Sequence, residues 1–175
     1  VHLAPSSIFK AITDQMLFDK VRKTYSLPEH FVLYVGDVNW NKNLQGLIEA
    51  FDIVRKTGLV KGQSLKPKLV LVGKAFLNDS LMETQHVNTL IHSLRLSEEI
   101  IKLGFVPEDD LVVIYNVADV YVQPSLAEGF GLPVLEAMVC GVPIISTIYN
   151  PGSNEIVENE KDGLLVPVAD EKTLA

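Results

Sequence analysis

The chain has 175 residues, of which 47% are hydrophobic and 21% charged, and its formal net charge is −7. This apolar content excludes a disordered chain, and the length is enough for one domain with its own core. The acidic balance excludes the broad basic face of a nucleic-acid binder. The one cysteine, Cys140, excludes an internal disulfide and predicts a reducing, cytoplasmic location. No apolar run reaches the roughly 18 residues of a membrane span.

The first part of the chain, residues 1–30, has weak hydrophobic periodicity, which predicts a linker with a short helix near residues 14–24. After it, residues 31–175 are predicted to form one domain in which short apolar runs alternate with helical stripes. Strands are predicted at 31–36, 69–73, 101–106, 119–123, 142–146 and 164–166. Helices are predicted over 43–57, 82–95, 107–116 and 132–140, and residues 170–175 are expected to open a further, truncated helix.

This alternation of strands and helices predicts an α/β fold with a doubly wound parallel sheet of about six strands. In such sheets a ligand binds beyond the carboxyl ends of the strands, near the point where the strand order reverses. The loops that deserve examination are therefore those after Gly36, Gly73, Phe105, Gln123 and Ser146.

The segment after the fourth predicted strand, residues 124–138, contains a strand end, a glycine-rich turn and a helix start. Gly129 and Gly131 allow positive φ angles and let a ligand approach the backbone. The amides of Phe130, Gly131 and Leu132 would be free donors at the helix N-terminus, where anions are favoured. The turn therefore predicts a cradle for a diphosphate.

Two glutamates, Glu128 and Glu136, lie on either side of this turn. Glu136 is placed to accept hydrogen bonds from the two hydroxyls of a ribose. Glu128 could do the same for a sugar, or stabilise positive charge at an anomeric carbon. The same residues also fit a simple tight turn, with Glu128 as a helix-dipole partner and Glu136 as a solvated helix residue. Val134 occupies the third glycine position of a dinucleotide fingerprint, which disfavours hydride transfer.

With its flanks, this segment resembles the retaining glycosyltransferases of the GT-B fold, family 4, also called group 1. The spacing of Glu128 and Glu136 matches the E-x7-E element of that family. The resemblance extends from about residue 30 to the end of the chain, and it implies a Rossmann-like domain, the C-terminal half of a GT-B fold. The other matching segments are residues 34–36, 42–43, 103–107, 118–120, 123–125, 129–133, 135–138, 140–143, 154–157 and 162–167.

The resemblance implies a role for each matching site residue. Glu128 would contact the transferred sugar, Lys42 would neutralise the departing diphosphate, and Glu136 would bind the ribose. A front-face mechanism is favoured in this family, so Glu128 is not expected to act as a covalent nucleophile. The remaining binding positions, mostly through their backbone, would be Gly36, Phe105, Val106, Phe130, Gly131 and Leu132.

One position departs from the family pattern. Directly after Gly36 the family usually has an arginine that binds the diphosphate, whereas this chain has Asp37. An acid near a diphosphate is unfavourable by Coulomb's law. Either the loop turns Asp37 away, or another cation replaces the arginine, or activity is impaired.

The resemblance implies the donor-binding domain of a retaining hexosyltransferase that takes its sugar from a nucleotide sugar of the UDP or GDP type. It implies no metal and no further cofactor. The acceptor would be bound by an N-terminal domain absent from this sequence, through which peripheral membrane contact stays open, and the fragment alone is expected to be inactive. Two alternatives remain: a nucleotide-sugar epimerase on the same scaffold, and a non-catalytic nucleotide-binding module, which Asp37 favours.

Overall fold

The computed structural model describes residues 4–57, 66–129, 131–148 and 153–175, without the side chain of Asn154. Within these residues, six parallel strands form one sheet, as predicted, and their order in it is β3-β2-β1-β4-β5-β6. The order reverses between β1 and β4, which pair directly. The strands are β1 (Phe31–Val35), β2 (Lys68–Val72), β3 (Ile100–Leu103), β4 (Val120–Gln123), β5 (Ile144–Thr147) and β6 (Leu164–Val166).

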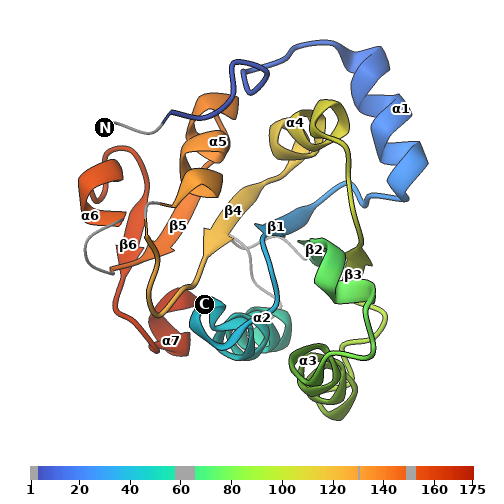
Figure 1. Cartoon of the computed structure of the whole chain (residues 1–175), viewed down its shortest axis with the longest axis vertical. Helices are drawn as coiled ribbons and strands as arrows, with labels where there is room; N and C mark the ends of the chain where they lie inside the picture. Colours follow the sequence, from blue (N-terminus) through green and yellow to red (C-terminus); the bar gives the residue numbers. More distant parts are fainter. Residues whose placement is uncertain (1–3, 58–65, 130, 149–152) are drawn as a thin grey trace.

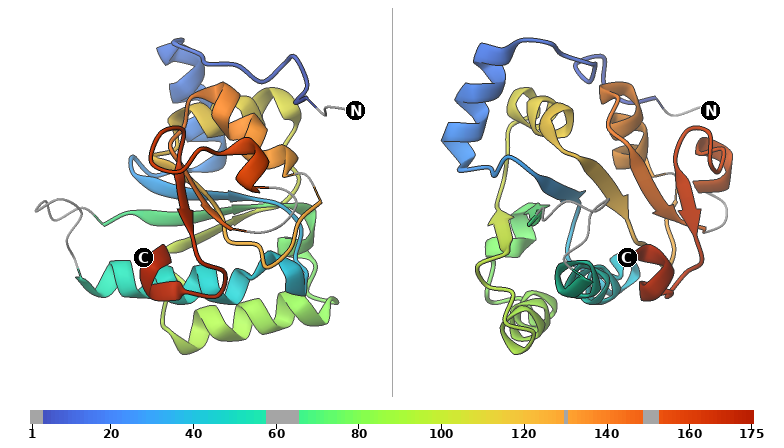
Figure 2. Two further views of the ribbon diagram at one scale, coloured as in Figure 1. Left: turned by 90° about the vertical axis from the view of Figure 1, so that its left-hand side faces the viewer. Right: turned by 180° about the vertical axis from the view of Figure 1, so that it is seen from behind.

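Helices cover both faces of the sheet, which explains why the central strands are almost continuously apolar. One face is covered by α1 (Gln15–Tyr25), α4 (Glu108–Val117) and α5 (Leu132–Cys140), as Figures 1 and 2 show. The opposite face is covered by α2 (Leu44–Thr57), α3 (Met82–Ser93) and α7 (Glu171–Leu174). Three short elements were not predicted from the sequence: the 3₁₀ helices η1 (Trp40–Lys42) and η2 (Lys74–Leu77), and α6 (Ser153–Ile156).

The N-terminal segment, interpreted from sequence as a linker, packs against the domain. Phe9 is buried, and its ring meets that of Tyr115 edge to face with centroids 5.9 Å apart. Asn116 holds the backbone of this segment, accepting the amide of Ile12 at 2.7 Å and donating to the carbonyl of Lys10 at 2.9 Å. Residues 4–30 therefore belong to the packing of the same core rather than spanning open solvent.

The carboxyl ends of β1 and β2 approach each other closely. The Gly36 amide donates to the Val72 carbonyl at 3.0 Å, and a Cβ atom added at Gly73 would lie 2.0 Å from the Gly36 carbonyl oxygen. A side chain at Gly73 therefore forces these strand ends apart.

We expect Gly73→Ala to lower the free energy of unfolding by about 1–3 kcal/mol, the usual cost of overpacking. Gly129→Ala is the matched control, because no described atom lies within 4 Å of a Cβ added there. It should change the free energy of unfolding by less than about 0.5 kcal/mol. Urea denaturation of both variants measures the difference, and equal stabilities would contradict the close approach at Gly73.

Candidate functional site

The loops that follow β1 and β4 meet at the point where the strand order reverses. The amide of Leu126 donates to the Asn41 carbonyl at 2.7 Å, and the side-chain amide of Asn41 donates to the Ala127 carbonyl at 3.2 Å. Parallel strands have their carboxyl ends at the same edge of a sheet, so the loops that follow them can meet there. These bonds therefore join two loops that lie far apart in sequence. At the sheet edge where a ligand was expected, the loop after β1 and the loop after β4 are therefore held together by hydrogen bonds.

Lys42 and Glu128, the two residues assigned to catalysis, form an ion pair at this junction. The Lys42 ammonium contacts Oε1 of Glu128, and the two side chains are only 17% and 13% exposed. Lys42 is the last residue of η1, which ends because Asn43 adopts a left-handed φ of 50°. The short helix thus directs a cation onto a carboxylate 86 positions away.

Two further donors, which the sequence analysis did not identify as site residues, reach the same carboxylate. Gln123 Nε2 lies 2.9 Å from Glu128 Oε1, and the Ser125 hydroxyl lies 3.0 Å from that oxygen. Gln123 also donates to Ser125 Oγ at 2.7 Å. Both residues are buried, which lowers the local dielectric and strengthens each bond. The available signal was a polar residue, Gln123, at the end of an otherwise apolar strand.

Glu136 lies on α5, one turn beyond the start of the helix, and is partly buried. Burial raises the pKa of this carboxyl, the hydrogen bond from the Tyr115 hydroxyl at 3.0 Å opposes the rise, and the charge of Glu108 adds to it. The Tyr115 ring packs edge to face on Tyr121, with centroids 5.6 Å apart. Tyr121 in turn donates its hydroxyl to Gln123, so one buried pair of tyrosines supports both glutamates.

The two glycines of the turn, which both allow a positive φ, differ in conformation. Gly131 has a φ of 78° and precedes α5, while Leu132, its first residue, is 39% exposed. Gly129 has no positive φ; it is exposed, with open space beside its Cα. Pro133 has no amide hydrogen, and the Val134 amide donates to the Gly131 carbonyl at 2.9 Å. Gly131 and Leu132 therefore carry the amides that have no acceptor among the described residues at the start of α5. Phe130, a predicted donor, lies outside the described residues.

The predicted base-binding positions lie at the end of β3. Phe105 is 67% exposed, and the Lys74 ammonium lies 4.8 Å from the centroid of its ring. Val106 is 6% exposed and its side chain belongs to the core, so it can offer a ligand only its backbone. Lys74 is a cation at this edge that the sequence analysis did not assign to the site.

Asp37, which replaces the expected arginine, caps its own loop. Its Oδ1 accepts the amide of Val38 at 2.9 Å, while its carbonyl accepts the hydroxyl of Tyr34 at 3.0 Å. Burial, followed by the charges of Glu128 and Asp37, raises the pKa of Tyr34 far above its usual value. The Asp37 side chain is exposed and engaged in the turn. This favours the explanation that the loop turns Asp37 away from the diphosphate.

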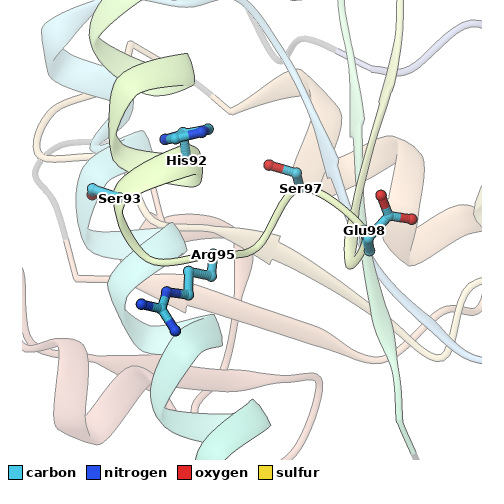
Figure 3. Close-up of a pocket in the computed structure, with 5 residues that line it drawn as sticks. All are labelled: His92, Ser93, Arg95, Ser97 and Glu98. Atoms are coloured by element: carbon cyan, nitrogen blue, oxygen red, sulfur yellow. The ribbon is translucent and has the colours of Figure 1, made fainter.

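An open pocket elsewhere does not compete with this site. It lies between the end of α3 and the start of β3, lined by His92, Ser93, Arg95, Ser97 and Glu98. In Figure 3 the Arg95 and Glu98 side chains point in different directions, so no charged groups converge there.

In the part of the chain that the structure describes, no three His, Cys, Asp or Glu side chains are grouped to hold a metal ion. None of the described helices is long and apolar enough to cross a membrane.

The profile of the family described as glycosyl transferases group 1 matches residues 18–175. The chain belongs to this family. It is 35% identical over 116 residues to the O-antigen chain mannosyltransferase B of Escherichia coli, an alignment that covers 66% of this chain and 28% of that protein. The residues of the β1–β4 edge lie within the range that the family profile matches.

Solved structures share its fold. Sucrose-phosphate synthase from Thermosynechococcus elongatus superposes with a TM-score of 0.76 at 29% identity, over 98% of this chain and 39% of that one. The Anabaena protein Alr3699/HepE, solved in complex with UDP-glucose, gives a TM-score of 0.77 at 22% identity, over 97% of this chain and 43% of that one. The group 1 chain thus spans less than half the length of these relatives.

Proposed function

We propose that the chain binds a nucleotide sugar for a retaining glycosyltransferase, and that the protein carrying it transfers the sugar to an acceptor. The observation that supports this best is the Lys42–Glu128 pair, held beside the N-terminus of α5 at the reversal of strand order. A cation and free amides suit a diphosphate, while a carboxylate suits sugar hydroxyls. The ion pair therefore places a group for the diphosphate directly beside a group for the sugar.

The names of two similar proteins also support transfer from a nucleotide sugar. The Escherichia coli relative is named a mannosyltransferase, and the Anabaena structure contains UDP-glucose. Both names fit transfer from a nucleoside diphosphate sugar better than epimerisation or binding without catalysis. The likeness to the Anabaena protein concerns the fold, and we propose a donor of the UDP-sugar or GDP-sugar type.

In the proposed reaction, the bond between the anomeric carbon and the diphosphate breaks, and its electron pair stays on the phosphate oxygen. The oxygen of the acceptor hydroxyl bonds to the anomeric carbon on the same face, and the hydroxyl proton passes to that phosphate oxygen. Lys42 and the amides at the start of α5 stabilise that oxygen, because they are donors fixed where negative charge develops. The Glu128 carboxylate faces the positive charge that develops at the anomeric carbon. No step requires Glu128 to form a bond to the sugar, which agrees with a front-face, retaining course.

The proposed reaction also needs a binding site for the acceptor, which we do not place on the residues of this chain. We propose that a further domain of the same protein binds the acceptor and makes any peripheral membrane contact. A reducing, cytoplasmic location is supported by the single cysteine, Cys140, which is buried in the core rather than available for a disulfide. The chain by itself should therefore bind the donor without transferring its sugar.

Calorimetric titration of the chain with UDP and with GDP tests the donor-binding proposal. We expect one of the two to bind in a one-to-one complex. The corresponding nucleoside, which lacks the phosphates, should bind at least about tenfold more weakly, since it loses the charge-assisted contacts at Lys42 and α5. If neither nucleotide binds, or if nucleoside and nucleotide bind equally, the proposal fails.

A further inference from the structure

Gln123 is a polar side chain at the carboxyl end of β4 that is almost fully buried, at 1% exposure. Both protons of its amide nitrogen are used, one on Ser125 Oγ at 2.7 Å and one on Glu128 Oε1 at 2.9 Å. Its oxygen accepts the hydroxyl of Tyr121. Burial of an amide is costly unless its groups are paired, and this amide is paired on both ends.

The Glu128 carboxylate and the Tyr121 hydroxyl together set which end of the Gln123 amide faces Glu128. Tyr121 donates to the amide oxygen, so the nitrogen must point the other way, toward the carboxylate. A rotation by half a turn would place the amide oxygen against Glu128, where two acceptors repel each other. The carboxylate therefore selects a donor, rather than an acceptor, beside it, and the hydrogen bond from the buried tyrosine supports this orientation of the amide.

Three donors converge on one oxygen of Glu128. Gln123, Ser125 and Lys42 all contact Oε1. A carboxylate held through one oxygen has a fixed direction, and its second oxygen is turned to the other side. The donor cluster therefore sets the orientation of Glu128 before any ligand arrives, and preorganised groups need no rearrangement when they bind.

We propose that Gln123 is a positioning residue for Glu128, and that the Tyr121 hydroxyl holds the Gln123 amide in its working orientation. The pair turns the Glu128 carboxylate so that its second oxygen meets the transferred sugar. Gln123 itself does not touch the donor. This inference rests on the proposed function, because it assumes that Glu128 contacts the sugar of a nucleotide sugar.

The test compares a nucleotide sugar with its nucleoside diphosphate, using the UDP-glucose and UDP pair or the GDP-mannose and GDP pair, whichever the unaltered chain binds. We expect Gln123→Met, which keeps the length of the side chain, to weaken binding of the nucleotide sugar about tenfold. Binding of the nucleoside diphosphate should change less than about twofold, because its contacts lie on Lys42, α5 and the ribose site. Tyr121→Phe should shift the ratio of the two dissociation constants in the same direction by about threefold to fivefold.

Tyr25→Phe is the matched control for Tyr121→Phe. It removes a tyrosine hydroxyl that donates to Asp110 at 2.7 Å, between α1 and α4 and away from the site. It should leave the ratio of dissociation constants unchanged. If Gln123→Met does not fold, Tyr121→Phe, which removes one oxygen atom, still decides.

A ratio that stays constant in the variants would overturn the inference, since a purely structural role weakens both ligands equally or neither. Failure of the proposed function would look different, because the unaltered chain would then bind none of the four ligands.

Discussion

Lys42→Met should weaken binding of the nucleoside diphosphate about 100-fold. The substitution keeps the aliphatic stem but removes the charge that contacts Glu128 and, in the proposed complex, the diphosphate. A hydrogen bond to a charged group contributes about 1.5–3 kcal/mol, and a 100-fold change in affinity is about 2.7 kcal/mol. Calorimetry with the nucleotide that the unaltered chain binds measures the effect.

The same substitution should also destabilise the free protein. Breaking a buried ion pair costs about 3–5 kcal/mol because the remaining charge is left uncompensated. Glu128 retains its bonds from Gln123 and Ser125, so we expect a smaller loss of about 2 kcal/mol in the free energy of unfolding. Lys42 thus combines a structural and a binding role.

Lys161→Met is the matched control for Lys42→Met. It breaks another lysine–glutamate pair, with Glu158, in which both side chains are about two-thirds exposed at 68% and 64%. Such surface pairs contribute at most about 1 kcal/mol, so affinity should stay unchanged and stability should change little. Equal effects of Lys42→Met and Lys161→Met on nucleotide affinity would show that Lys42 does not contact the diphosphate.

Glu136→Ala should weaken nucleotide binding by a similar factor of about 100, because a carboxylate that accepts two ribose hydroxyls is lost. Glu136→Gln should cost less, about tenfold, since a neutral amide oxygen still accepts a hydrogen bond. It should also preserve the contact with the Tyr115 hydroxyl. Affinities for the nucleotide and for its free diphosphate separate the ribose contact from the phosphate contacts: only the nucleotide should be affected.

The raised pKa of Glu136 gives this residue a pH signature. Because the folded protein disfavours the charged form, the contribution of Glu136 to stability is greatest below its pKa in the unfolded chain. That contribution declines as the pH rises through its folded pKa. Glu136→Gln should therefore raise the thermal unfolding midpoint at pH 7 while weakening nucleotide binding.

The binding affinity of the unaltered chain should show the opposite trend, falling as Glu136 becomes protonated at acidic pH. Glu136→Gln should remove that part of the pH dependence. A profile that Glu136→Gln leaves unaltered would contradict a ribose contact by the ionised carboxylate.

Much of the fold follows from local chemistry in the sequence. Short apolar runs ending in glycine predict β1 and β2, and Pro133 and Gly141, which mark the ends of α5, predict that helix over its full length. The alternation of elements predicts a parallel sheet with a site at its carboxyl edge, and the observed strand order has its reversal there. These features depend on neighbouring residues alone, so they can be predicted without the tertiary structure.

The contacts within the site depend on tertiary structure and could not be predicted in the same way. Lys42 and Glu128 were each assigned from the family resemblance, but their ion pair exists because β4 lies beside β1. Gln123 gives no periodic signal, and its role appears only once Tyr121 and Glu128 lie on either side of it. Phe9 is a single buried aromatic in a segment of weak periodicity, which predicts a linker.

A crystal structure of the chain with its preferred nucleoside diphosphate tests the central claim most directly. The account predicts that the diphosphate lies at the start of α5, contacting the amide of Leu132 and the ammonium of Lys42, with the ribose hydroxyls on Glu136. A nucleotide bound instead in the pocket between α3 and β3, or anywhere away from the β1–β4 edge, would contradict it.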